Sequence, residues 1–263
     1  MAEHSIPDGL IAYSERGEGP TVVLLHAFPL NGRMWEPQAK VLKDNYRVVM
    51  PDYPGFGRSA RGPAQPDVSY YARCIHRLVD RLGVESFILG GISMGGYVAF
   101  QCLQLFPGRI RGLILADTRA EADAEEARKT RTETARRVAE EGVEVLIELQ
   151  LERLLAPQTI EKKGEVVERV RAMILQSSPE GVVGALGALR DRPDVNSMLP
   201  DIRVPTLVIG GEEDAISSPE VMGEMARKIT DSRHVVIPGA GHLSNLEAPR
   251  EFNIALRDFL ETL

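Results

Sequence analysis

The chain has 263 residues and a formal net charge of −7, and 43% of its residues are hydrophobic. A chain of this length and apolar content can bury a substantial core, which excludes an intrinsically disordered protein and suits one α/β domain with an insertion. Because the net charge is negative and basic residues are interleaved with acidic ones, we expect no nucleic-acid binding and a small molecule as the partner.

The N-terminal segment lacks a basic stretch followed by an apolar one, and no run of residues is apolar and long enough to span a membrane. We therefore expect a cytoplasmic protein with no membrane association. Cys74 and Cys102 both fall in helical patterns, which predicts buried free thiols, and the sequence has no metal-binding motif.

Short apolar runs alternate with amphipathic helical segments along the chain. This alternation is typical of a mostly parallel sheet flanked by helices. The predicted strands are, in chain order, Leu10–Tyr13, Val22–Leu25, Arg47–Met50, Phe87–Gly90, Leu113–Ala116, Val204–Ile209 and His234–Ile237.

The pentapeptide Gly91-Ile92-Ser93-Met94-Gly95 lies between a predicted strand and a predicted helix. It fits the small-x-Ser-x-small nucleophile elbow, in which a sharp turn requires small residues at both ends and lifts the serine hydroxyl above the helix N-terminus. Ser93 is therefore a candidate nucleophile. The alternative is a glycine-rich turn that only connects a strand to a helix.

Between Thr118 and Pro200 the strand signals stop, and charged helical stretches follow one another. These stretches are Ala124–Glu141, Val143–Leu155, Glu161–Gln176 and Pro179–Arg190. The sequence thus predicts an all-helical insertion between two strands of the core. Such an insertion either shapes substrate choice or only decorates the fold.

Asp214 is the candidate acid of a catalytic triad. It ends the loop Gly210-Gly211-Glu212-Glu213-Asp214 that follows a strongly apolar run, whereas Glu212 and Glu213 are expected to point into solvent. The nearest rival is Asp117, which directly follows the apolar run 112–116.

His242 is the candidate base, because a serine hydroxyl is a poor nucleophile until a histidine takes its proton. It lies between small residues in a loop that follows a predicted strand. The other four histidines fit less well: His4 lies in a polar tail, His76 in a helical pattern, His234 inside a strand and His26 at a strand end.

The chain order Ser93, Asp214, His242 is that of the α/β-hydrolases. The chain resembles this superfamily, and within it the group of 3-oxoadipate enol-lactonases, small carboxylesterases and cofactor-free perhydrolases. The segments that carry the resemblance span nearly the whole chain: residues 24–29, 51–59, 89–97, 115–119, 210–214 and 239–249. A serine at position 93 argues against the haloalkane dehalogenase and epoxide hydrolase relatives, which use an aspartate there.

The resemblance implies an α/β-hydrolase fold with residues 1–118 and 201–263 as the core and residues 119–200 as a helical cap over the active site. His26-Ala27-Phe28-Pro29 matches the oxyanion loop of the family, with alanine in place of a glycine. In that case the backbone N–H groups of Phe28 and Met94 form the oxyanion hole and His26 is structural. No cofactor is implied.

For the substrate we expect a small carboxylic ester or lactone. Trp35 and Tyr97, with Met34 and Phe28, are candidates for an apolar pocket, and Arg119 is a candidate partner of a substrate carboxylate, with a solvated surface arginine as the alternative. Two other functions stay open: perhydrolysis, in which hydrogen peroxide replaces water at the acyl-enzyme, and a hydrolase-like receptor that keeps the triad for ligand sensing.

Overall fold

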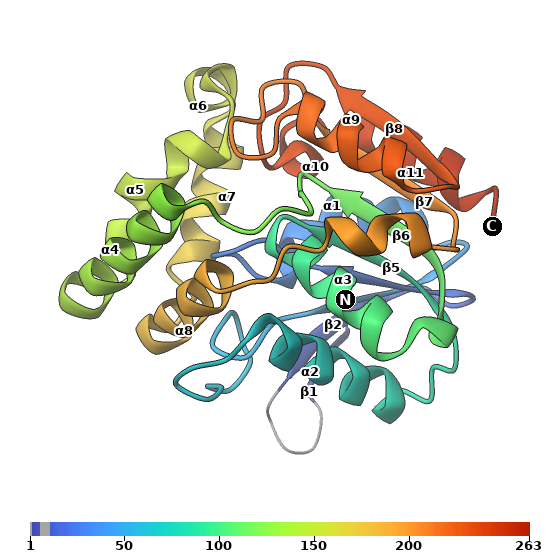
Figure 1. The fold of residues 1–263 in the computed structure, drawn as a ribbon, viewed down its shortest axis with the longest axis horizontal. Helices are drawn as coiled ribbons and strands as arrows, with labels where there is room; N and C mark the ends of the chain where they lie inside the picture. The colour runs from blue at the N-terminus through green and yellow to red at the C-terminus, as the bar shows by residue number, and fades with distance from the viewer. Residues whose placement is uncertain (1, 6–10) are drawn as a thin grey trace.

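The computed structural model describes residues 2–5 and 11–263, and its centre is one β-sheet with helices on both faces (Figure 1). In this part of the chain the sheet has eight strands in the order β1-β2-β4-β3-β5-β6-β7-β8. The strands from β4 to β8 in this order are parallel to one another, whereas β2 pairs antiparallel with β4 and β1 antiparallel with β2. The bounds are β1 Ala2–Ser5, β2 Ala12–Arg16, β3 Thr21–Leu25, β4 Arg47–Pro51, β5 Phe87–Ile92, β6 Ile110–Ala116, β7 Thr206–Gly211 and β8 Ser232–Ile237.

Helices α2, α3 and α9 cover one face of the sheet, and α1 and α11 cover the other (Figure 1). Every residue of β5 and β7 is buried, as expected for parallel strands that are covered on both faces. The bounds are α1 Glu36–Leu42, α2 Val68–Arg81, α3 Met94–Leu105, α9 Pro219–Lys228, α10 Ser244–Glu247 and α11 Pro249–Leu260, with short 3-10 helices η1 Gly32–Trp35, η2 Pro107–Arg109 and η3 Asn196–Asp201.

The parallel arrangement brings several loops together. The carboxyl ends of β3, β5, β6, β7 and β8 lie at the same edge of the sheet, which is where open α/β sheets place their ligands. The loops that follow these strands carry the candidate site residues of the sequence analysis. The predicted mostly parallel sheet flanked by helices is thus confirmed.

The N-terminal part of the sheet differs from the prediction. Leu10, where we expected the first strand to begin, lies outside the described residues, and the strand next to it is β2, which begins at Ala12. His4, expected in a polar tail, lies in the edge strand β1, where its ring stacks on Tyr13. A four-residue polar strand at a sheet edge has no apolar alternation, so hydrophobic periodicity cannot reveal it.

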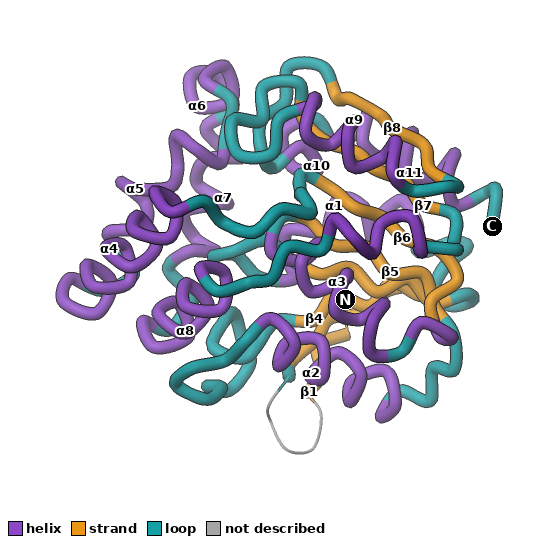
Figure 2. The backbone as a smooth tube through the Cα atoms, in the orientation of Figure 1, coloured by secondary structure: helices purple, strands orange, loops and turns teal. Residues whose placement is uncertain are grey.

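The segment between β6 and β7 contains the predicted helical insertion (Figure 2). Its helices are α4 Glu125–Glu141, α5 Val145–Leu154, α6 Pro157–Lys162, α7 Gly164–Ile174 and α8 Pro179–Arg190. The expected single helix over residues 161–176 is divided, because Lys163 has a non-helical backbone (φ −123°, ψ 59°) between α6 and α7. The division into a core and a cap at residues 118/119 and 200/201 stays a prediction.

Candidate active site

Ser93 lies at the sharp turn between β5 and α3 and has an unusual backbone, with φ 54° and ψ −115°. Such a conformation costs roughly 1–3 kcal/mol and persists only where its surroundings impose it. The surroundings explain the two glycines of the pentapeptide. A Cβ atom on Gly91 would lie 2.2 Å from the carbonyl oxygen of Gly95, and one on Gly95 would lie 2.4 Å from that of Leu25. No larger residue fits at either position without a shift of the backbone.

The structure brings Ser93, His242 and Asp214 together. Nε2 of His242 lies 2.8 Å from Oγ of Ser93, and Nδ1 lies 2.9 and 2.8 Å from the two carboxylate oxygens of Asp214. His242 and Asp214 are both buried. Because an ionised carboxylate can only accept hydrogen bonds, Nδ1 carries the proton and Nε2 is left to accept one from the serine hydroxyl. Asp214 is itself held by the backbone N–H groups of Ile216 and Ser217.

Asp117, the rival candidate for the acid, has other partners. Its carboxylate accepts hydrogen bonds from the backbone N–H of Gly211 at 2.8 Å and from the hydroxyl of Ser244 at 2.5 Å. Burial raises the pKa of Asp117 well above its ordinary value, and the charge of Asp214 raises it further. Asp117 therefore ties the ends of β6 and β7 to the segment after His242, and the structure places Asp214 beside the imidazole.

The loop that carries His242 is held by Glu247, a residue that the sequence analysis did not select. One carboxylate oxygen accepts hydrogen bonds from the backbone N–H groups of Gly241 and Leu243, at 3.0 and 3.2 Å, and these residues flank His242. The other oxygen accepts one from the N–H of Ala156 in the insertion, at 2.8 Å. Glu247 is buried, so its carboxylate fixes the position of the His242 loop relative to the insertion. The only sequence signal was a glutamate five positions after the histidine.

The turn after β3 contains the residues predicted for the oxyanion hole. Met94 is the first residue of α3, and Phe28 lies in the turn closed by a hydrogen bond from the N–H of Leu30 to the carbonyl of Ala27. Among the described residues, neither the N–H of Phe28 nor that of Met94 has a hydrogen-bond acceptor. Two free backbone donors thus lie at the two turns that frame Ser93.

His26 is structural, as expected. It is fully buried, its Nδ1 donates to the carbonyl of Ala27, and its Nε2 accepts from the N–H of Tyr53 at 2.9 Å. Burial lowers the pKa of His26 to about 4, so its imidazole is neutral at physiological pH. Its two hydrogen bonds join the turn after β3 to the segment after β4.

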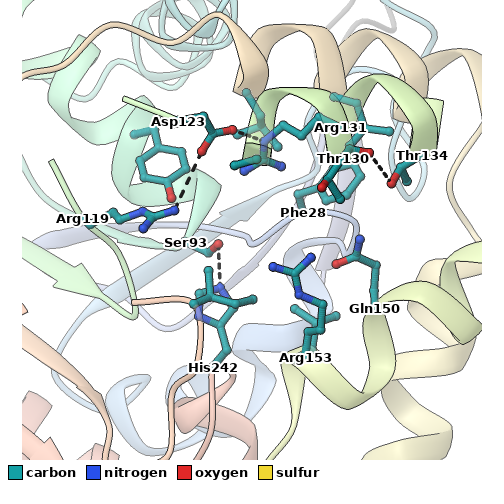
Figure 3. Close-up of a pocket in the computed structure, with 16 residues that line it drawn as sticks. Phe28, Ser93, Arg119, Asp123, Thr130, Arg131, Thr134, Gln150, Arg153 and His242 are labelled. Carbon is teal, nitrogen blue, oxygen red and sulfur yellow. Dashed lines mark hydrogen bonds and ion pairs between the residues drawn. The ribbon is translucent and has the colours of Figure 1, made fainter. Parts of the chain in front are cut away.

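A cavity of about 100 Å³ opens above the Ser93 hydroxyl (Figure 3). Its walls come from the core and from three helices of the insertion, α4, α5 and α8, so the insertion covers the site. The lining residues are Phe28, Ser93, Tyr97, Arg119, Asp123, Ala127, Thr130, Arg131, Thr134, Gln150, Arg153, Leu154, Leu186, Leu189, Ile216 and His242.

Of the predicted substrate contacts, Phe28, Tyr97 and Arg119 line this cavity, and Trp35 and Met34 do not. The prediction for Trp35 is wrong: its side chain is fully buried in the core and packs against Phe252 of α11. Trp35 is close to the oxyanion turn in sequence, but its indole packs on the face of the sheet that α11 covers.

The cavity wall contains a buried ion cluster around Asp123. Its carboxylate pairs with Arg131, with Arg192 at 2.6 Å and with Arg119 at 3.8 Å. Burial alone would raise the pKa of Asp123, but the hydrogen bonds and charges of Arg131 and Arg192 outweigh burial and lower it. The guanidinium of Arg192 also lies over the ring of Tyr97, 4.2 Å from its centroid, which fixes that ring in the wall.

Among the side chains that the structure describes, no three from His, Cys, Asp or Glu lie together as a metal ion would require. In the same part of the chain, no helix has the length and apolar character needed to cross a membrane. Both cysteines are buried thiols that form no disulfide with each other, as the helical pattern predicted.

The fold and the elbow are those of a known family. The family model of the alpha/beta hydrolase fold matches residues 20–249, and the chain belongs to this family.

Three proteins to which this chain is similar are an esterase, an enol-lactonase and a bromoperoxidase. The chain is 42% identical to a thermophilic esterase from Thermogutta terrifontis whose structure has malate bound, with a TM-score of 0.93 over 96% of this chain and 93% of the other. It is 28% identical to 3-oxoadipate enol-lactonase 2 of Acinetobacter baylyi, over 95% of this chain and 92% of the other. It is 26% identical to a bromoperoxidase from Bacillus anthracis, with a TM-score of 0.85 over 95% of both chains.

Proposed function

We propose that this protein is a serine hydrolase that cleaves a small carboxylic ester or lactone through an acyl-enzyme. The observation that carries the proposal is the continuous chain of hydrogen bonds from Ser93 Oγ through both imidazole nitrogens of His242 to Asp214. This is the arrangement that activates a serine hydroxyl for attack on an acyl carbon.

His242, Asp214 and Ser93 carry the proton transfers of both acylation and deacylation. His242 takes the proton of Ser93 as the hydroxyl attacks the carbonyl, and then donates it to the leaving alcohol oxygen. Asp214 keeps the proton on Nδ1 and stabilises the imidazolium. The same histidine then activates a water molecule that attacks the acyl-enzyme and releases the acid.

The N–H groups of Phe28 and Met94 are proposed to bind the oxyanion of both tetrahedral intermediates. A backbone donor of this kind contributes roughly 3–4 kcal/mol to transition-state stabilisation. Both groups are free for the role, since the described residues offer them no acceptor.

The size of the cavity supports a small substrate. Ligand sites for larger molecules span roughly 300–1,000 Å³, whereas the space above Ser93 is about 100 Å³. The esterase and enol-lactonase relatives support an ester or a lactone as the substrate class.

The test is hydrolysis of p-nitrophenyl esters of increasing acyl length and of a set of lactones. We expect turnover of the acetate and butyrate esters, much weaker turnover of the octanoate, and a loss of at least about a thousandfold in Ser93→Ala, in which only the binding groups remain. Wild-type turnover in Ser93→Ala would rule out the proposal. Because a bromoperoxidase is among the relatives, peracid formation from acetate and hydrogen peroxide is measured alongside, and a rate above hydrolysis would make perhydrolysis the main reaction on the same three residues.

A further inference from the structure

The charged side chains of the cavity are predominantly cationic, although the protein as a whole is acidic. Arg119, Arg131 and Arg153 line the cavity, and Asp123 is the one carboxylate among its lining residues. The pKa of Asp123 is lowered, so it is ionised and its charge offsets one of the cations. With low-dielectric walls around it, such a cavity holds a positive potential and attracts anions.

The three arginines are not equivalent. Arg119 and Arg131 both pair with Asp123, as described above. Arg153 has no hydrogen bond or ion pair with any residue that the structure describes, and its side chain is exposed. Arg119 keeps only an ion pair with Asp123 at 3.8 Å, and its buried Nε has no hydrogen-bond partner among the described residues. Of the three guanidinium groups, that of Arg153 is therefore the one with neither a hydrogen bond nor an ion pair to the described residues.

Arg153 lines the same cavity as the reacting side chains of Ser93 and His242. It lies on α5 of the insertion, one helical turn after Gln150, and both side chains line the cavity that contains Ser93 and His242. In Figure 3 the guanidinium of Arg153 points into the cavity, toward the Ser93 and His242 side, with the Gln150 amide on its other side. A guanidinium presents paired donors that match the two oxygens of a carboxylate.

We propose that Arg153, assisted by the Gln150 amide, binds a carboxylate carried by the substrate, so that the preferred substrates are half-esters of dicarboxylic acids or lactones with a carboxylate side chain. This inference rests on the proposed ester hydrolase function. It assigns carboxylate binding to Arg153 in place of Arg119, whose guanidinium has Asp123 as its partner.

The experiment compares esters of matched shape that differ in charge. Monomethyl succinate and monomethyl glutarate are paired with methyl 4-methylpentanoate and methyl 5-methylhexanoate, in which an isopropyl group replaces the carboxylate. The readout is the ratio of kcat/KM for the anionic ester to kcat/KM for its neutral partner. In the wild type we expect this ratio to exceed one, and to fall as the ionic strength is raised from about 0.01 M to about 0.5 M.

Arg153→Met removes the charge and keeps an apolar stem, and should lower the ratio about 10- to 100-fold, with partial recovery in Arg153→Lys. Arg136→Met, which removes an equal charge from the exposed face of α4 outside the cavity, is the matched control and should leave the ratio unchanged. A wild-type ratio of one or less, or an equal loss on both esters in Arg153→Met, overturns the proposal. A selective loss in Arg119→Met with none in Arg153→Met overturns it in favour of Arg119.

A binding measurement separates this inference from the proposed function. Succinate should raise the Tm of the wild type above that in sodium chloride of equal ionic strength, and should do so far less in Arg153→Met. If neutral esters are hydrolysed but succinate does not stabilise the wild type, the carboxylate site is refuted and the hydrolase function stands. If succinate stabilises the protein through Arg153 but no ester is hydrolysed, the site stands as an anion site and the hydrolase function is refuted.

Discussion

Replacement of Glu247 by glutamine tests whether one buried carboxylate couples the insertion to the catalytic loop. The carboxylate accepts three backbone hydrogen bonds, two from residues that flank His242 and one from Ala156. Glutamine offers a single oxygen, so at least one buried N–H group loses its acceptor and faces an NH2 group. An unsatisfied buried donor costs about 1–3 kcal/mol, and each remaining bond weakens by about 1 kcal/mol when its acceptor loses its charge. A neutral side chain costs less free energy to bury than a charged one, and this partly offsets the loss. We therefore expect the free energy of unfolding to decrease by about 3 kcal/mol.

Urea denaturation measures the free energy of unfolding of Glu247→Gln, and Glu251→Gln serves as the control because Glu251 is an exposed glutamate four residues away. We also expect kcat to fall about tenfold to a hundredfold, while KM changes little, because a small displacement of the imidazole impairs proton transfer more than binding. A Glu247→Gln protein with the stability and kcat of the wild type would refute the coupling.

Two further predictions concern buried ionisable groups. Asp214→Asn should reduce kcat far more than Asp117→Asn, since only Asp214 is bonded to the imidazole of His242; the reverse ranking of the two rates would move the acid to the end of β6. His26 has a pKa of about 4 in the folded protein against about 6.5 when unfolded, so the unfolded state binds the extra proton first and stability decreases as the pH falls from about 6.5 to about 4. The loss is about 3 kcal/mol at most, and urea midpoints measured across this window should show it in the wild type and much less in His26→Asn.

The sequence was most informative where local geometry restricts residue choice. The elbow could be predicted because Gly91 and Gly95 have backbone oxygens within 2.4 Å of where a Cβ would lie, so the turn itself dictates small residues. Asp214 and His242 could be predicted because each follows a strand of a parallel sheet, and all such strands end at one edge. The parallel topology alone therefore predicts that Asp214 and His242 lie close together.

The remaining features depend on contacts between distant segments. Trp35 lies near the oxyanion turn in sequence, but its buried indole packs against Phe252 of the distant helix α11. The importance of Glu247 depends on an N–H group 91 residues away, and the difference between Arg119 and Arg153 depends on which of them Asp123 engages. Sequence spacing alone carries none of this information.

The central claim is that Ser93 forms a covalent acyl-enzyme with help from His242. Intact-mass measurement after reaction with a fluorophosphonate tests it most directly, because this reagent leaves a stable covalent adduct on an activated serine. We expect the fluorophosphonate to add one label per wild-type chain, mapped to Ser93, and none to the Ser93→Ala protein. An unlabelled wild-type protein that still hydrolyses esters, or a label mapped to any other residue, would contradict it.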